Sequence, residues 1–132
     1  MSAVTLLCAD HPLPLYRSNS RRIRSTPSGP VTEDSFSVQT HKYYRQAVKE
    51  LGLTMKSFQY ELDLRATEED AVQLRAYLEQ HLHPGETAEL WNLWVSDIRV
   101  RAFRLTGPLA DLDADALVQM AEREQTCITL TI

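Results

Sequence analysis

The chain has 132 residues, 43% hydrophobic and 24% charged, which is the composition of an ordinary globular domain. No apolar run approaches the ~20 residues of a membrane-spanning helix, and Asp10 and Pro12 interrupt the apolar N-terminus, which disfavours a signal peptide and favours a cytoplasmic location. The net charge is −4, yet residues 1–56 contain eight Lys and Arg against four Asp and Glu, whereas residues 57–132 contain six against fourteen. We interpret this asymmetry as two halves that pack on each other, within one chain or between copies.

The first part of the chain predicts two strands and one helix. Ala3–Ala9 is an apolar run of strand length, and the weak alternation of Val31–Gln39 predicts a second strand. Between them, Arg17–Pro30 is rich in Ser, Pro and Gly and predicts a mobile basic loop. Thr40–Leu51 has helical apolar spacing, with Thr40 as its cap and Gly52 just beyond its end.

The clearest pattern in the chain is Met55–Arg65, which alternates apolar and polar residues. Side chains of a strand alternate between its faces, so this pattern predicts a strand that is buried on one face. The apolar side consists of Phe58, Tyr60, Leu62 and Leu64, and the polar side of Gln59, Glu61, Asp63 and Arg65.

The remaining elements follow in the order helix, strand, strand, helix, strand. Thr67 caps the second helix, and Asp113 caps the third. Leu90–Val95 and Ile98–Leu105 are strands that only two residues separate, which predicts a tight hairpin. Thr126–Ile132 predicts the final strand.

From residue 55 the predicted order is therefore β-α-β-β-α-β. Short connections and right-handed crossovers favour a ferredoxin-like α+β core over residues 55–132. In that topology the strands that begin at residues 55 and 98 are central antiparallel neighbours, and both helices cover one face. Residues 1–54 would add a strand, the basic loop and a helix to this core, all within a single domain of residues 1–132.

The face opposite the two helices is the first candidate for a binding surface. Glu61 and Asp63 would lie on it beside Arg99 and Arg101 of the partner strand. Two interpretations remain open, because acids and arginines on neighbouring strands either pair with one another or recognise a polar ligand or partner.

A nucleic-acid function is disfavoured. Domains that recognise RNA with this topology stack bases on aromatic residues of a strand that also contains a basic-Gly motif. Here that strand reads IRVRAFRL, with Phe103 as its one aromatic residue and no Gly. The cluster of Arg21, Arg22 and Arg24 within the segment from Arg17 leaves anion or nucleic-acid contact as an alternative.

The two tryptophans suggest self-association. Trp91 and Trp94 are three residues apart on a predicted strand, so they point to opposite faces. One enters the core, and the other lies on the open face of an edge strand, where an exposed Trp is a liability unless it is covered. The cover is the helix at Thr40–Leu51 or a second subunit, and we predict a homodimer.

Catalysis and metal binding have weaker signals. Cys8 with a histidine, His11 or His41, would suit a small nucleophilic enzyme, but no motif sets their geometry. Cys8, His11, His81 and His83 have ligand types that suit zinc, without a strong spacing motif, so neither a metal nor another cofactor is predicted. The sequence therefore predicts a non-catalytic binding domain, with a small enzyme that uses Cys8 as one alternative and anion contact through Arg17–Arg24 as another.

Overall fold

The computed structural model describes residues 3–17, 21–34, 36–42, 44–94, 103–122 and 125–132. These residues form nine strands, three α-helices and one 3-10 turn. The strands are β1 (Ala3–Ala9), β2 (Tyr16–Arg17), β3 (Arg21–Thr26), β4 (Gly29–Asp34), β5 (Ser37–Thr40), β6 (Phe58–Asp63), β7 (Thr87–Trp94), β8 (Phe103–Pro108) and β9 (Thr126–Thr131). The helices are α1 (Arg45–Glu50), α2 (Glu68–His81) and α3 (Ala114–Ala121), and the 3-10 turn is Leu109–Asp111.

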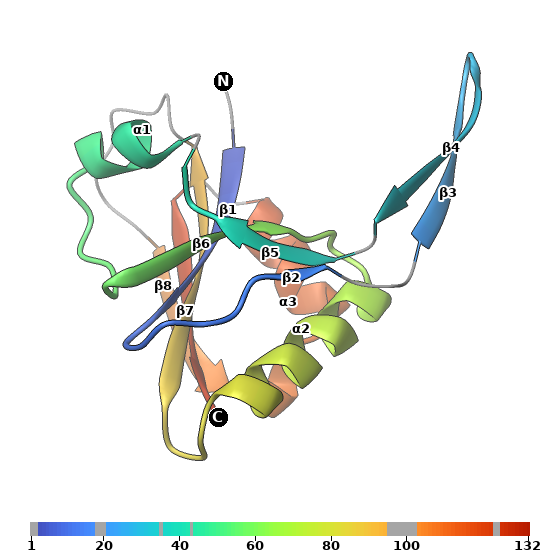
Figure 1. The fold of residues 1–132 in the computed structure, drawn as a ribbon. Helices are drawn as coiled ribbons and strands as arrows, with labels where there is room; N and C mark the ends of the chain where they lie inside the picture. Colours follow the sequence, from blue (N-terminus) through green and yellow to red (C-terminus); the bar gives the residue numbers. More distant parts are fainter. Residues whose placement is uncertain (1–2, 18–20, 35, 43, 95–102, 123–124) are drawn as a thin grey trace.

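Seven strands form one sheet in the order β2-β5-β6-β1-β7-β9-β8. Neighbouring strands are antiparallel except for β8 and β9, which are parallel and joined through α3. β1 occupies the centre of the sheet, with β6 on one side and β7 on the other (Figure 1). Both faces of β1 are buried, since Leu6 and Cys8 on one face and Leu7 and Ala9 on the other are fully enclosed.

The predicted ferredoxin-like core is wrong. β1 separates β6 from β7, and β9 separates β7 from β8, so the expected central pair of neighbouring strands does not exist. β7 and β8 therefore form no hairpin, and Ser96-Asp97 lies outside the described residues. The molecule is a mixed α and β protein whose N-terminal strand is the middle of its sheet. The physical reason is that Ala3–Ala9 is apolar on both faces, and a strand of that kind is stable only where both faces are covered.

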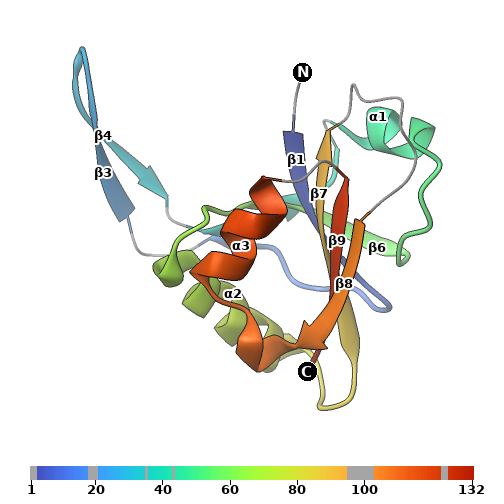
Figure 2. The ribbon, with the colours of Figure 1, turned by 180° about the vertical axis from the view of Figure 1, so that it is seen from behind.

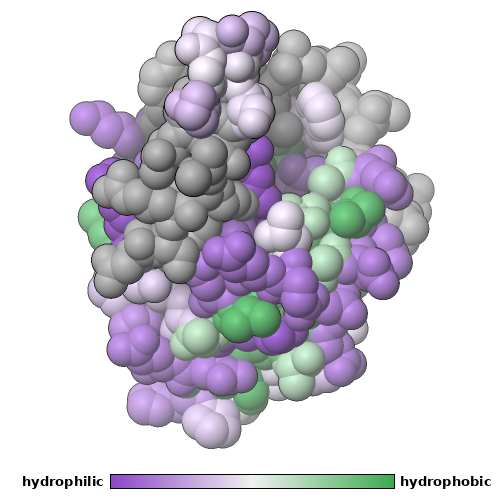
Figure 3. Space-filling model, turned by 90° about the vertical axis from the view of Figure 1, so that its right-hand side faces the viewer, coloured by the Kyte–Doolittle hydropathy of each residue, from purple (hydrophilic) through white to green (hydrophobic). Residues whose placement is uncertain are grey.

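The predicted mobile basic loop is a β-hairpin instead. β3 and β4 pair along their whole length and form a separate two-stranded sheet that projects from the body (Figures 1 and 2). Gly29 closes the turn with φ = +120°, a conformation that favours glycine, and Thr26 Oγ1 donates a hydrogen bond to its carbonyl oxygen at 2.5 Å. In Figure 3, which views the side that carries this hairpin, the coloured surface is mostly hydrophilic, and its hydrophobic groups form small, separate patches.

Several helix ends confirm the capping argument. The Thr67 side chain accepts a hydrogen bond from the Asp70 backbone N–H at 3.2 Å, and Asp113 accepts one from Ala116 at 2.9 Å. The first helix is shorter than predicted, because Thr40 ends β5 and α1 begins only at Arg45. Its C-terminal end is as predicted, since Gly52 has a positive φ of 69°.

The sheet is covered on both faces, which gives two apolar cores. α2 and α3 lie on one face, and α1 lies over the other (Figures 1 and 2). The larger core includes Leu7, Phe36, Leu74, Leu78, Leu90, Leu117 and Leu130. The smaller core includes Val4, Leu6, Cys8, Val48, Leu51, Trp91, Leu93 and Cys127. The second core makes the face opposite α2 and α3 a buried surface over the middle of the sheet, where an open polar face was expected.

Candidate functional site

The predicted polar face is retained only at the two ends of the sheet. On the face beneath α1, one cross-strand row runs through Gln39, Glu61, Leu6, Trp91, Cys127 and Arg104. The row is polar on β5 and β6, apolar in the middle under α1, and basic on the edge strand β8. A polar site on this face is therefore confined to the β5–β6 end or to the β8 edge.

Glu61 and Asp63 do not lie next to β8, the strand that the sequence suggested as their neighbour. Glu61 lies opposite Gln39 on one side and Leu6 on the other, four strands from β8. Arg99 and Arg101 lie outside the described residues. Glu61 and Asp63 nonetheless share a hollow of about 340 Å³, which is also lined by Tyr44.

The tryptophans point to opposite faces, as predicted, but neither is on an edge strand. Trp91 is fully buried in the smaller core; its indole N–H donates to Glu89 Oε1 at 3.3 Å, and the Arg104 guanidinium lies 5.1 Å from its ring centre. Trp94 lies on the α3 side and is partly buried, with its backbone bonded to the side chain of Gln125. β7 has a partner on each side, so the expected exposed edge Trp is wrong, and the prediction of a dimer loses that support.

Cys8 is enclosed in the smaller core. Burial, followed by the Glu89 carboxylate and Cys127, raises the pKa of the Cys8 thiol far above its ordinary value. Burial also raises the pKa of Cys127 to about 11. The reactive form of cysteine is the thiolate, which both sites disfavour, so the geometry speaks against Cys8 as a nucleophile.

We expect neither thiol to react with Ellman's reagent while the protein is folded. Both should react in concentrated urea, because unfolding exposes them and restores an ordinary thiol pKa. The measurement is the absorbance of the released thionitrobenzoate with and without urea. Stoichiometric labelling of Cys8 in the folded protein within minutes would contradict this environment and restore the nucleophile hypothesis.

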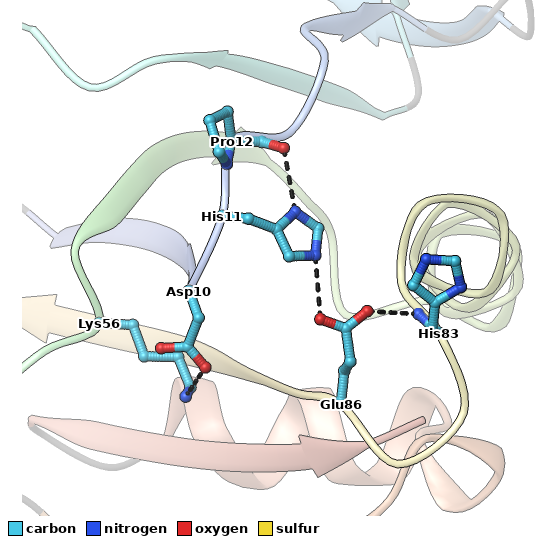
Figure 4. A network of polar contacts seen from close by, with 6 residues as sticks. All are labelled: Asp10, His11, Pro12, Lys56, His83 and Glu86. Atoms are coloured by element: carbon cyan, nitrogen blue, oxygen red, sulfur yellow. Dashed lines mark hydrogen bonds and ion pairs between the residues drawn. The ribbon is translucent and has the colours of Figure 1, made fainter.

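The histidines weighed as metal ligands have other contacts. His11 Nε2 lies 3.1 Å from Glu86 Oε2, and the backbone N–H of His83 donates to the other oxygen of the same carboxylate (Figure 4). The ring of His81 packs on Tyr77, with 4.7 Å between the ring centres. Within the described residues, no three His, Cys, Asp or Glu side chains come together in a way that could hold a metal ion.

Figure 4 shows what this polar network does. Glu86 joins the turn after α2 to the loop after β1, and Lys56 Nζ contacts Asp10 of that loop at 2.7 Å. The hydrogen bond from His83 is the main cause that lowers the pKa of Glu86, and His11 contributes. These contacts connect neighbouring turns at the surface. They give His11 and His83 a structural role that requires no bound ligand.

The arginines singled out in the sequence lie on the projecting hairpin. The register places Arg21 opposite Asp34 and Arg22 opposite Glu33, so opposite charges occupy cross-strand positions. Arg24 lies opposite Val31. Two of these three arginines therefore have an acidic residue at the opposite position of the neighbouring strand.

Basic residues gather instead where β5 ends. Three hollows adjoin there: a central one of about 220 Å³ that includes Thr40, Arg45 and Phe58, one of about 540 Å³ that shares Thr40, and one of about 320 Å³ that shares Arg45. We call their charged and exposed apolar lining residues the basic surface. It consists of Leu15, Tyr16, Arg17, Lys42, Arg45, Lys49 and Phe58. No acidic side chain is among the described residues that line these hollows.

A buried histidine lies beneath this surface. The side chain of His41 is only 4% exposed and lines the central hollow, and its Nδ1 is 3.7 Å from Glu61 Oε1. That distance is too long for a hydrogen bond, and among the described residues neither ring nitrogen has a hydrogen-bond partner. Burial lowers the pKa of His41, against the opposing effect of Glu61. A neutral imidazole with unused donor and acceptor capacity therefore faces the hollow.

Sequence reasoning missed Lys42, Arg45 and Lys49, although a signal was present. Their spacing of three and four residues is that of one helical face, and they sit at or just before α1. The residue Phe58 was expected to be buried, but it is 38% exposed because β5 stops before it reaches that position.

Comparison with known proteins supplies no family for this arrangement. The chain matches no protein-family model, no curated protein and no solved structure. Within the described ranges, no helix is both long and apolar enough to cross a membrane.

Proposed function

We propose that this chain is a non-catalytic binding domain that takes an acidic segment of a partner protein on the basic surface. The observation that carries the proposal is the combination of charge and apolar exposure there. Four cationic side chains line the three adjoining hollows, with no described acid among them. Such a surface attracts an anionic partner and speeds its association.

Exposed apolar side chains favour a protein segment over a small free anion. Leu15, Tyr16 and Phe58 are 60%, 40% and 38% exposed, and they are three of the six large exposed apolar residues described. All three line these hollows. Aromatic and arginine side chains that become buried supply much of the binding energy of protein interfaces, whereas exposed ion pairs contribute about 0–1 kcal/mol each.

Nucleic acid fits this surface less well. Glu61 and Asp63 line a neighbouring hollow that shares Gln39 with one of these three, and there they would repel a continuous phosphate backbone. A short acidic peptide can contact the four cations without crossing that hollow. The proposal therefore takes a peptide as the ligand and makes nucleic acid an outcome of the test.

The test is selection of random dodecapeptides displayed on phage, with the whole protein as bait. We expect the selected peptides to be rich in Asp and Glu. Their affinity should fall about tenfold for the variant Lys42→Gln/Arg45→Gln, because two ionic contacts of roughly 0.7 kcal/mol each are lost.

The matched control is Gln80→Glu/Gln119→Glu, which changes the net charge by the same amount at exposed positions on α2 and α3. It should leave affinity within about twofold, since these charges lie outside the basic surface. Selected peptides without acidic enrichment, or an equal loss in both variants, would overturn the proposal. Tighter retention of random single-stranded DNA than of the peptides, at equal salt, would replace it by nucleic-acid contact.

A further inference from the structure

One strand of the main sheet has a free stretch of edge inside the central hollow. β1 pairs with β6 from Glu61 to Phe58, whereas β5 pairs with β6 only from Asp63 to Tyr60. Phe58 and Gln59 therefore have a neighbouring strand on one side only. Both residues line the central hollow, together with Ser57 and Tyr60.

Free edges of this kind are normally protected. Proteins blunt them with charged residues, prolines or bulges, because unpaired backbone groups are a template for another strand. At Phe58 and Gln59 the strand has none of these devices, and Phe58 is exposed. Arg45 is charged and lines the same hollow, but it is a residue of α1 and not of the edge strand, so it does not protect the edge.

We propose that the acidic partner segment binds as an added β-strand along this edge, in line with β5 and beside Phe58 and Gln59; this inference rests on the proposed function. Backbone hydrogen bonds of the added strand supply affinity in this mode of recognition, and alternate side chains supply specificity. The free edge is short, so the strand pairs over two or three residues and gains the rest of its affinity from side chains.

The two faces of β6 specify the chemistry of that strand. Gln59 lies on the α1 face, where it shares two hollows with Arg45, while Phe58 lies on the opposite face. A residue paired with Gln59 consequently points its side chain toward Arg45, and its neighbours point theirs toward Phe58. The segment that fits has acidic and apolar residues in alternation.

His41 marks the point where β5 leaves the sheet and the added strand begins. Its buried ring has no hydrogen-bond partner among the described residues, yet it lines the same hollow. A buried polar group left unpaired is unfavourable, and a hydrogen bond to a backbone or carboxylate group of the ligand would remove that cost.

A second copy of the chain is the wrong occupant. Pairing of two identical edges about a two-fold axis would bring the same surface of both copies together. Arg45 and Lys42 of one copy would then face Arg45 and Lys42 of the other, and like charges in juxtaposition oppose association. An acidic segment of a different chain removes this conflict.

The experiment is an N-methyl scan of a peptide selected on the whole protein, in which each backbone N–H is methylated in turn. Within the two or three residues that pair, an added strand directs every second N–H toward β6, so affinity should fall at least about tenfold at one position, or at two positions separated by one residue, and little elsewhere. Hydrogen exchange of the Phe58 or Gln59 amide should also slow when the peptide is bound. Equal tolerance at all positions, with affinity still dependent on Lys42 and Arg45, overturns the strand mode and leaves the proposed function intact. If no acidic peptide is selected, both proposals fall.

Discussion

A fragment that begins at Met55 and ends at Ile132 is expected not to fold. The fragment lacks β1, which forms four cross-strand register pairs with β6 and six with β7. Without it the sheet divides between β6 and β7, and ten of the 26 buried apolar side chains described are missing. A chain of this size has a net stability of only about 5–15 kcal/mol, which the loss of a central strand exceeds. The measurement is far-ultraviolet circular dichroism with urea titration, and a cooperative transition in the fragment would contradict the observed topology.

The control removes only the two peripheral strands and leaves the main sheet in place. Replacement of residues 20–34 by a short Gly-Ser linker deletes β3 and β4, which form their own two-stranded sheet. Phe36 and the pairing of Tyr16 with Val38 are retained. We expect this deletion to keep the cooperative transition and to change the free energy of unfolding by no more than about 1 kcal/mol, since an isolated two-stranded hairpin is only marginally stable.

Replacement of Trp91 by Ala is expected to lower the free energy of unfolding by about 3–5 kcal/mol. The indole is fully buried in the smaller core, where its removal leaves a cavity between the sheet and α1. The change also removes the contact with Arg104 and the hydrogen bond to Glu89. Chemical denaturation of the variant and the wild type gives the difference directly.

Two further variants define the cause of that loss. Trp91→Phe retains much of the volume and should cost clearly less than Trp91→Ala. Val72→Ala, on the exposed side of α2, should change stability by less than about 0.5 kcal/mol. A cost below about 1 kcal/mol for Trp91→Ala would mean that the smaller core is not closed over the sheet.

Local features of the fold could be predicted because local chemistry determines them. Thr67 and Asp113 cap helices by hydrogen bonds within one turn, and Thr126–Thr131 forms the predicted final strand. These features depend on a few neighbouring residues. The same holds for Gly52, whose positive φ ends α1.

Strand order could not be predicted in the same way. The neighbours of β6 depend on the relative stability of its pairing with every other strand. The rule that short connections join neighbouring strands favoured partners from the C-terminal part of the chain, whereas β6 pairs with β5 and β1. The relevant signal was the apolar character of Ala3–Ala9 on both of its faces, which is typical of a central strand. The sequence alone was also consistent with an edge strand there, because a short apolar run does not identify its partners.

The candidate site depends on that order. Phe58 is exposed only because β5 ends at Thr40, and it shares a hollow with Arg45 only because α1 folds back over the sheet. The acids of the predicted open face line a hollow next to the basic surface, and among the described residues Glu61 contacts His41. The sequence pattern therefore pointed to β6 but not to the basic residues that line the hollows beside it.

If the basic surface is the binding face of this protein, a bound acidic peptide changes the environment of its backbone amides. The measurement is a titration of the ¹⁵N-labelled protein with a selected acidic peptide, followed by amide chemical shifts. We expect the largest shifts at Leu15–Arg17, Thr40–Arg45 and Phe58–Tyr60. Largest shifts on α2 and α3, with these three segments unchanged, would contradict it.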